Sequence, residues 1–137
     1  MKPKLLLRIA AILMFLHTIG HTFGALGWKK APNAAVAGVI SGMENNHFDF
    51  MGRTTTIASF YEGYGYCMIA VLLFISVVLW LLSAEPAAKL LPLIAVFLLL
   101  LAVVEFIYFF AFAAAFSLLA GLCTLLAFIR RKQMQIP

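Results

Sequence analysis

The sequence predicts an all-α fold: a polytopic membrane protein in which four transmembrane helices form a bundle. Hydrophobic residues make up 65% of the 137 residues and charged residues only 11%, whereas soluble domains carry about half apolar and a quarter charged residues. The apolar residues also gather into four runs, and a run of about 20 apolar residues crosses the hydrocarbon core of a bilayer. We therefore expect one transmembrane domain over residues 1–137, with spans at 5–27, 57–83, 90–110 and 112–129.

The positive charges flank the spans instead of forming a stripe. Three of the ten Lys and Arg residues precede or open the first span, at positions 2, 4 and 8, and three follow the last span, at positions 130–132. This is the positive-inside pattern of membrane proteins, and it predicts that both termini lie in the cytoplasm. The net charge of +5 therefore indicates a lipid bilayer as partner and no nucleic acid.

The first span covers residues 5–27 and ends beside Trp28, a typical interfacial anchor. A cleaved signal peptide is the main alternative, because Ala35-Val36-Ala37 resembles a cleavage site. The apolar run is too long for a signal peptide, and Lys29 and Lys30 stand before that site. We therefore expect a retained transmembrane helix.

Residues 28–56 form the long loop, on the outer side of the membrane. A short interfacial helix is expected over residues 33–43, with Asn33 as its N-cap. Residues 44–53 mix polar and aromatic side chains, and the length of the loop predicts a structured lid or binding loop. Residues 54–56 are three threonines, which are candidate N-caps for the second span.

The second half of the chain holds three closely spaced spans. Tyrosines at the outer end of span 57–83 suit the membrane interface, and a turn containing Pro86 follows. Pro92 lies in the first turn of span 90–110, where proline is tolerated. A tight turn at residues 110–113 then leads to span 112–129. Because this turn carries no charge, a single long kinked helix is the alternative there.

Small residues recur every fourth position in two spans, a spacing at which helices approach closely. They are Gly20 and Gly24 in the first span, and Ala113, Ser117 and Gly121 in the fourth. We interpret both stripes as helix-packing surfaces.

Two histidines four residues apart, His17 and His21, interrupt the first span. This spacing puts both imidazoles on one face of a helix, roughly 6 Å apart along its axis. Ionisable groups inside a bilayer are costly, so the pair predicts a functional site.

Two glutamates are expected at a similar depth in the membrane. Counting about 1.5 Å per residue from the outer ends of the spans, His21 lies roughly 9 Å deep and His17 roughly 15 Å deep, while Glu62 and Glu105 each lie roughly 7–8 Å deep. All four then fall in the outer half of the bilayer and predict one shared ligand-binding site. Tyr61 lies beside Glu62, and Asp49 and Arg53 can close over the site from the loop.

Three interpretations of this site stay open. Two imidazoles and two carboxylates suit a divalent metal ion such as zinc, iron or manganese, although Thr18 replaces the glutamate of the zincin motif and bis-histidine haem fits poorly. Without a metal, buried Glu and His can exchange protons near pH 7, which serves proton-coupled transport or isomerisation of a lipid-like substrate. The third interpretation is structural: the four groups hold the helices together, and Asp49 and Arg53 form a loop salt bridge.

The first half of the chain carries a family resemblance. The segments His17 to Gly24, Phe50 to Thr54 and Ser59 to Gly65 resemble those of a family of small bacterial four-span inner-membrane proteins of unknown function. Glu62 stands where many relatives carry Asp. The resemblance implies four spans and an inner-membrane location, and it implies no activity.

Overall fold

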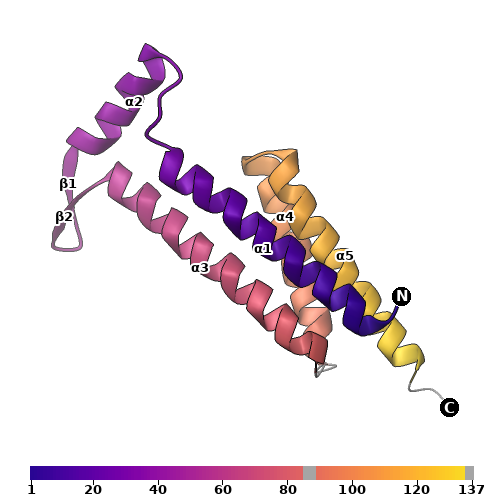
Figure 1. Cartoon of the computed structure of the whole chain (residues 1–137). Coiled ribbons are helices and arrows are strands. Elements are labelled where there is room, and N and C mark those ends of the chain that lie inside the picture. The colour runs from indigo at the N-terminus through magenta and orange to yellow at the C-terminus, as the bar shows by residue number, and fades with distance from the viewer. Residues whose placement is uncertain (85–88, 135–137) are drawn as a thin grey trace. The chain divides into compact units, whose positions relative to one another are not determined.

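The computed structural model describes residues 1–84 and 89–134 and contains five helices and one β-hairpin in that part of the chain (Figure 1). The elements are α1 (Pro3–Gly27), α2 (Ala34–Asn45), β1 (His47–Phe50), β2 (Arg53–Thr56), α3 (Ile57–Ala84), α4 (Leu90–Tyr108) and α5 (Ala111–Gln133). α1, α3, α4 and α5 are each long and apolar enough to span a membrane. The predicted all-α, four-helix membrane fold is therefore confirmed. The expected turn containing Pro86 falls on residues 85–88, outside the described residues.

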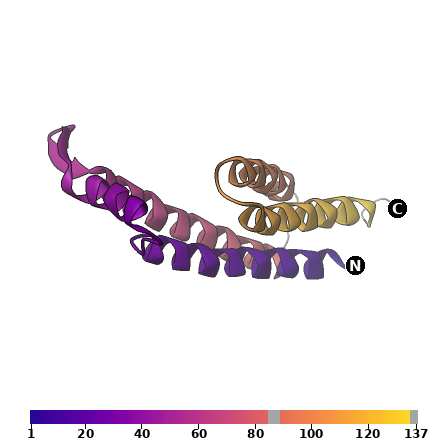
Figure 2. The ribbon, with the colours of Figure 1, turned by 90° about the horizontal axis from the view of Figure 1, so that it is seen from above.

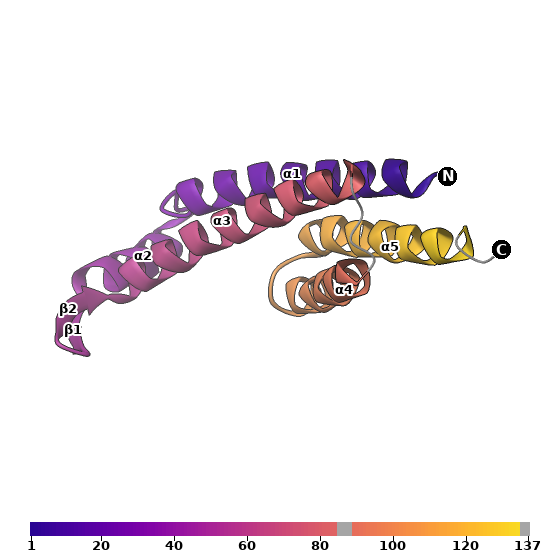
Figure 3. The same cartoon turned by 90° about the horizontal axis from the view of Figure 1, so that it is seen from below.

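The described residues divide into two compact units. We call residues 1–18 together with 72–84 and 89–134 the bundle unit, and residues 19–71 the hairpin unit. The bundle unit holds the first half of α1, the last part of α3, and all of α4 and α5. Within it, α5 lies between α4 and the first half of α1 (Figures 2 and 3).

The core of the bundle unit is made of apolar side chains from all four helices. Its fully buried large apolar residues are Leu7, Met14, Leu72, Leu79, Leu91 and Leu98. A hydrogen bond adds to this packing, because the Ser76 hydroxyl in α3 donates to the carbonyl oxygen of Ala11 in α1 at 2.9 Å. A serine buried in an apolar bundle needs such a partner, and α1 supplies it.

α4 and α5 are two separate helices, as the tight-turn prediction required, and the alternative of one long kinked helix is wrong. The backbone N–H of Phe109 donates to the Glu105 carbonyl and closes α4. Phe109 and Phe110 then both leave the helical region, and Phe110 is fully extended with φ −156° and ψ 153°. Two consecutive non-helical residues reverse the chain, so the third span ends at Tyr108 instead of residue 110.

Close packing through small residues occurs in only one of the two predicted stripes. A Cβ added to Gly121 would lie 3.1 Å from two side-chain carbons of Leu99 and 3.2 Å from the Cβ of Leu98, so α5 approaches α4 closely there. A Cβ added to Gly20 or Gly24 meets no atom of the described residues within 4 Å. The packing prediction therefore holds for Gly121 and is not met at Gly20 and Gly24.

The hairpin unit orders the long loop between α1 and α3. The Asn33 side chain accepts a hydrogen bond from the Val36 amide at 2.9 Å and caps α2, as expected. β1 and β2 pair antiparallel, with Phe50 opposite Arg53. Met51 and Gly52 turn the hairpin with φ 52° and 81°. Two positive φ values in a two-residue loop are typical of a type I′ turn, which glycine favours.

A threonine links the hairpin to the next span. The Thr56 hydroxyl accepts a hydrogen bond from the Ser59 amide at 3.1 Å, so Thr56 is the N-cap of α3 among the three threonines that the sequence offered.

Candidate functional site

His17 is the centre of a buried polar contact between three helices of the bundle unit. Its Nε2 lies 3.4 Å from Oε1 of Glu105 in α4, and its Nδ1 lies 3.3 Å from the hydroxyl oxygen of Ser117 in α5. His17 is 5% exposed, Glu105 6% and Ser117 0%. The structure thus brings His17 and Glu105 together, as the sequence predicted.

Helical periodicity carries each of these side chains into the core. The buried residues of α1 recur at three- and four-residue steps, and His17 continues the row that contains Ala10 and Met14. In α4 the same steps lead from Leu98 through Ala102 to Glu105. Because each polar residue replaces one member of an apolar row, the fold forces it inward, where it requires a polar partner.

The imidazole of His17 also lies against an aromatic ring. Its centroid is 5.8 Å from that of Phe116, and the two rings are inclined by 26°. Phe116 in turn makes an edge-on contact with Phe112, whose centroid is 5.1 Å away. Contacts on the ring face, together with polar partners at both nitrogens, restrict rotation of the imidazole.

Ser117 is the member of the site that sequence reasoning did not identify. Its place in the stripe with Gly121 favoured a packing role, and its burial is consistent with that role. The hydroxyl nevertheless has a second use, because it can donate to Nδ1 or accept from it, whichever tautomer His17 adopts. The sequence did offer one signal for a polar role: the stripe has a serine at this position, whereas its other members are alanine and glycine.

Glu105 retains an unused oxygen. Oε1 faces His17, whereas Oε2 is buried and has no hydrogen-bond partner within residues 1–84 and 89–134. Buried polar atoms are normally hydrogen-bonded, and exceptions often mark catalytic groups, ions or water. Oε2 of Glu105 is therefore available to take up a proton or to bind a ligand.

His21 belongs to the hairpin unit and is half-buried. Its Nε2 is buried and makes no hydrogen bond to any residue that the structure describes. His21 is thus a second imidazole in α1, one turn after His17, with an unused nitrogen.

Glu62 is held by a lysine that sequence reasoning overlooked. Its Oε1 lies 2.9 Å from Nζ of Lys29, and the same ammonium group lies 2.8 Å from Oε1 of Glu44 in α2. Beside this contact, Tyr61 packs on Trp28 with ring centroids 4.9 Å apart. Lys29 therefore ties α2 to the beginning of α3. The available signal was a cation directly after the first span.

The Lys29 contact predicts a pH dependence. The hydrogen bonds to Glu44 and Glu62 raise the pKa of Lys29 above its ordinary value of 10.5. A raised pKa stabilises the folded contact fully below the ordinary value, and that stability is lost as the pH rises through the folded value. We expect the contact to be constant at neutral pH and to open only in strongly alkaline solution.

Fluorescence of Trp28 can report this opening, because Nζ of Lys29 lies 5.4 Å from the centre of its ring. The measurement uses a Trp80→Phe background, so that Trp28 is the only tryptophan. In this background, Lys29→Met should already show the altered Trp28 emission at neutral pH. Its change in emission at alkaline pH then gives the contribution of tyrosine ionisation, which is subtracted from that of the parent chain. Lys30→Met is the matched control and should follow the parent chain. An alkaline transition that is identical in the parent chain and in Lys29→Met would contradict the prediction.

Asp49 and Arg53 lie on the hairpin, on opposite strands. Oδ1 of Asp49 accepts a hydrogen bond from the Thr54 hydroxyl at 2.7 Å. In the part of the chain that the structure describes, neither residue takes part in an ion pair, so the expected loop salt bridge between them is absent. The hydroxyl of the cross-strand neighbour replaces the arginine as partner.

No group of three or more His, Cys, Asp or Glu residues lies close enough to hold a metal ion, as far as the described residues extend. His17 and Glu105 offer two ligand atoms at one place. A metal site of His17, His21, Glu62 and Glu105 therefore stays a prediction.

These features define the class of protein: a multi-pass α-helical membrane protein with a buried His–Glu–Ser contact. In comparisons with known proteins, no family matches the chain, and no curated protein and no solved structure is similar to it.

Proposed function

We propose that the protein is an inner-membrane protein, with both termini in the cytoplasm, that binds and releases a proton at the His17–Glu105 pair to drive proton-coupled transport. Glu and His chains facing the interior of helical bundles are typical of proton relays in pumps and transporters. The two side chains of the pair have almost no exposed surface, and they lie inside a bundle of apolar helices.

The observation that carries the proposal is the unused oxygen of Glu105. A contact built only to hold helices together gains most when every buried polar atom is bonded, because an unsatisfied buried group costs about 1–3 kcal/mol. Oε2 of Glu105 lacks such a partner among the described residues. This vacancy favours a group that takes up a proton.

The arrangement allows one proton to move without changing the charge of the pair. When Glu105 is protonated, its O–H donates to Nε2 of neutral His17, and Nδ1–H donates to the Ser117 hydroxyl oxygen. When the proton moves to Nε2, a carboxylate faces an imidazolium, and Ser117 still accepts from Nδ1–H. A second proton on the carboxyl group then gives the pair a charge of +1, which is the loaded state that transport requires.

Infrared spectroscopy of the protein in liposomes tests proton binding directly. We expect the carbonyl band of a protonated carboxyl group to appear and disappear as the pH is varied. Glu105→Gln should abolish this band, whereas Glu44→Gln, the same change on the exposed helix α2, should leave it intact. A titrating band that survives in Glu105→Gln would contradict the proposal.

Proton flux in the same liposomes tests transport. With an imposed pH gradient and a potassium diffusion potential, an enclosed pH-sensitive dye should report faster dissipation for the wild type than for empty liposomes. His17→Ala and Glu105→Gln should reduce the rate to that of empty liposomes. Equal rates for the wild type and both variants, together with a normal fold, would favour a purely structural contact.

Binding of a divalent metal ion is a second candidate, because the same unused carboxylate oxygen can coordinate one. Metal analysis of the purified protein separates the two. Stoichiometric zinc, iron or manganese in the wild type that is lost in His17→Ala and His21→Ala would favour the metal site.

A further inference from the structure

We propose that the bundle unit holds the phosphate headgroup of an anionic phospholipid in a cavity between the beginning of α1 and the end of α5. The cavity has a volume of about 350 Å³. None of its lining residues belongs to the contact of His17, Glu105 and Ser117. It is lined by Met1, Lys2, Pro3, Arg130, Gln133 and Met134.

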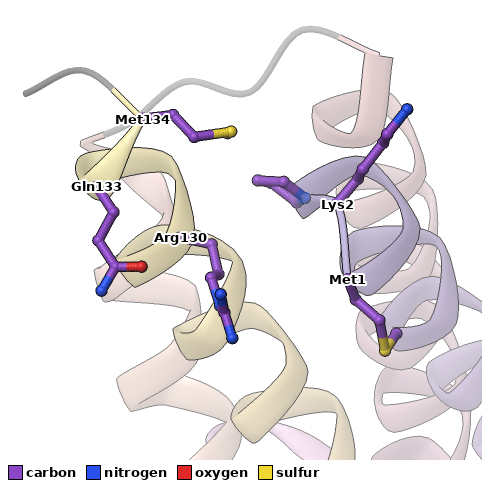
Figure 4. A pocket seen from close by; sticks show the side chains of 6 residues that line it. Met1, Lys2, Arg130, Gln133 and Met134 are labelled. Atoms are coloured by element: carbon purple, nitrogen blue, oxygen red, sulfur yellow. The ribbon is translucent and has the colours of Figure 1, made fainter. Parts of the chain in front are cut away.

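The lining provides groups that suit a phosphate. In Figure 4 the guanidinium of Arg130 extends into the space between the two helix ends. Arginine presents a planar fork of N–H donors that matches phosphate oxygens, and it keeps its charge at every physiological pH. The Lys2 ammonium points away from Arg130 in the same view. Its exposed four-carbon stem can turn to bring a second cation to a bound anion.

The surrounding charge favours an anion. Seven of the ten Lys and Arg residues belong to this end of the spans, in three chain segments: Lys2, Lys4, Arg8, Lys89, Arg130, Arg131 and Lys132. Among the described acidic residues, Glu44, Asp49 and Glu62 belong to the hairpin unit, and Glu105 is paired with His17. Nη1 of Arg131, in the last turn of α5, is buried and lacks a hydrogen-bond partner in the described part of the chain.

The apolar lining favours a lipid over free phosphate. Met1, Pro3 and Met134 form part of the wall, and the thioether of Met134 reaches toward the N-terminal segment (Figure 4). The cavity also lies at the ends of two membrane-spanning helices, which is the level of the headgroups. Basic pockets at the ends of transmembrane helices bind anionic headgroups in this way.

Native mass spectrometry of the full chain in detergent tests the site. The protein is titrated with phosphatidylglycerol, with phosphatidylcholine and with inorganic phosphate. We expect saturable binding of phosphatidylglycerol and little binding of the zwitterionic lipid. Arg130→Gln should weaken phosphatidylglycerol binding about fivefold, the effect of one cation at an anionic headgroup. Adding Lys2→Gln should weaken it further.

Arg53→Gln is the matched control, since it removes the same charge from the exposed hairpin and should leave lipid binding unchanged. All three substitutions are at exposed positions, and circular dichroism checks that the helices are retained. Equal losses for Arg53→Gln and Arg130→Gln, or equal binding of the two lipids, would overturn the proposal. Displacement of the lipid by equimolar inorganic phosphate would assign the cavity to a soluble anion and overturn the lipid as its occupant.

Discussion

Replacing His17 with alanine is expected to lower the free energy of unfolding by about 3 kcal/mol. The substitution removes the partner of Glu105 and leaves a carboxyl group buried at 6% exposure inside apolar helices. Breaking a buried ion pair by removing one member costs about 3–5 kcal/mol, mostly because the remaining charge is uncompensated. The lost imidazole also opens a cavity beside Phe116. Unfolding in mixed micelles, followed by circular dichroism, measures the change.

The double variant His17→Leu/Glu105→Leu separates pairing from packing. Replacing both members with apolar residues of similar size is expected to bring stability back to within about 1 kcal/mol of the wild type. Ser117 can then bond to its own helix backbone, as serines in helices do. His47→Ala, which truncates an exposed histidine on β1, should change stability by less than about 0.5 kcal/mol. If His17→Ala unfolds like His47→Ala, the buried pair does not stabilise the bundle.

Enlarging Gly121 is the second large effect. Gly121→Leu is expected to destabilise the protein by about 3 kcal/mol, because even a Cβ at this position would lie within 3.1–3.2 Å of Leu98 and Leu99. The Leu98 atom in this contact is its Cβ, which moves only with the backbone of α4, so α4 and α5 must separate. The same unfolding assay measures the loss.

Gly20→Leu is the matched control for Gly121→Leu. A Cβ at Gly20 meets no atom of the described residues within 4 Å, and leucine is a better helix former than glycine. We expect this variant to be as stable as the wild type or more stable by up to about 1 kcal/mol. Because Gly121 lies one turn after Ser117, Gly121→Leu should also reduce proton flux. If Gly121→Leu and Gly20→Leu destabilise the protein equally, the close approach of α4 and α5 is not the reason that a large side chain is excluded at Gly121.

The candidate site was only partly predictable from the sequence. The residues that bear chemistry were identified because His17, His21, Glu62 and Glu105 interrupt apolar runs, which is a local property. Counting depth along the spans placed all four in the outer half of the bilayer, but it put Glu105 nearer the level of His21 than of His17, so the specific pairing with His17 was not predicted. Two actual partners were missed. Ser117 belongs to a stripe of small residues, and Lys29 lies just beyond a span, so neither stands out in composition.

Some structure is determined by sequence alone, because its causes lie within a few residues. The thickness of the hydrocarbon core sets the length of each span, and the observed helices agree with the predicted runs to within a few residues at most ends. Asn33 and Thr56 cap their helices through bonds to amides three residues ahead. The break between α4 and α5 was expected as a tight turn, although the sequence left one long kinked helix as the alternative.

Only the tertiary structure decided which polar atoms meet. α4 is apolar on almost every face, so its sequence does not specify which face turns inward. That rotation follows from the packing of α4 against α5 at Gly121, and it directs Glu105 toward His17. Depth in the membrane is set by the sequence through the rise per residue. Rotation about the helix axis is set by the shapes of neighbouring helices, which are distant in the chain, and it turned two histidines in one helix into a contact of His17, Glu105 and Ser117.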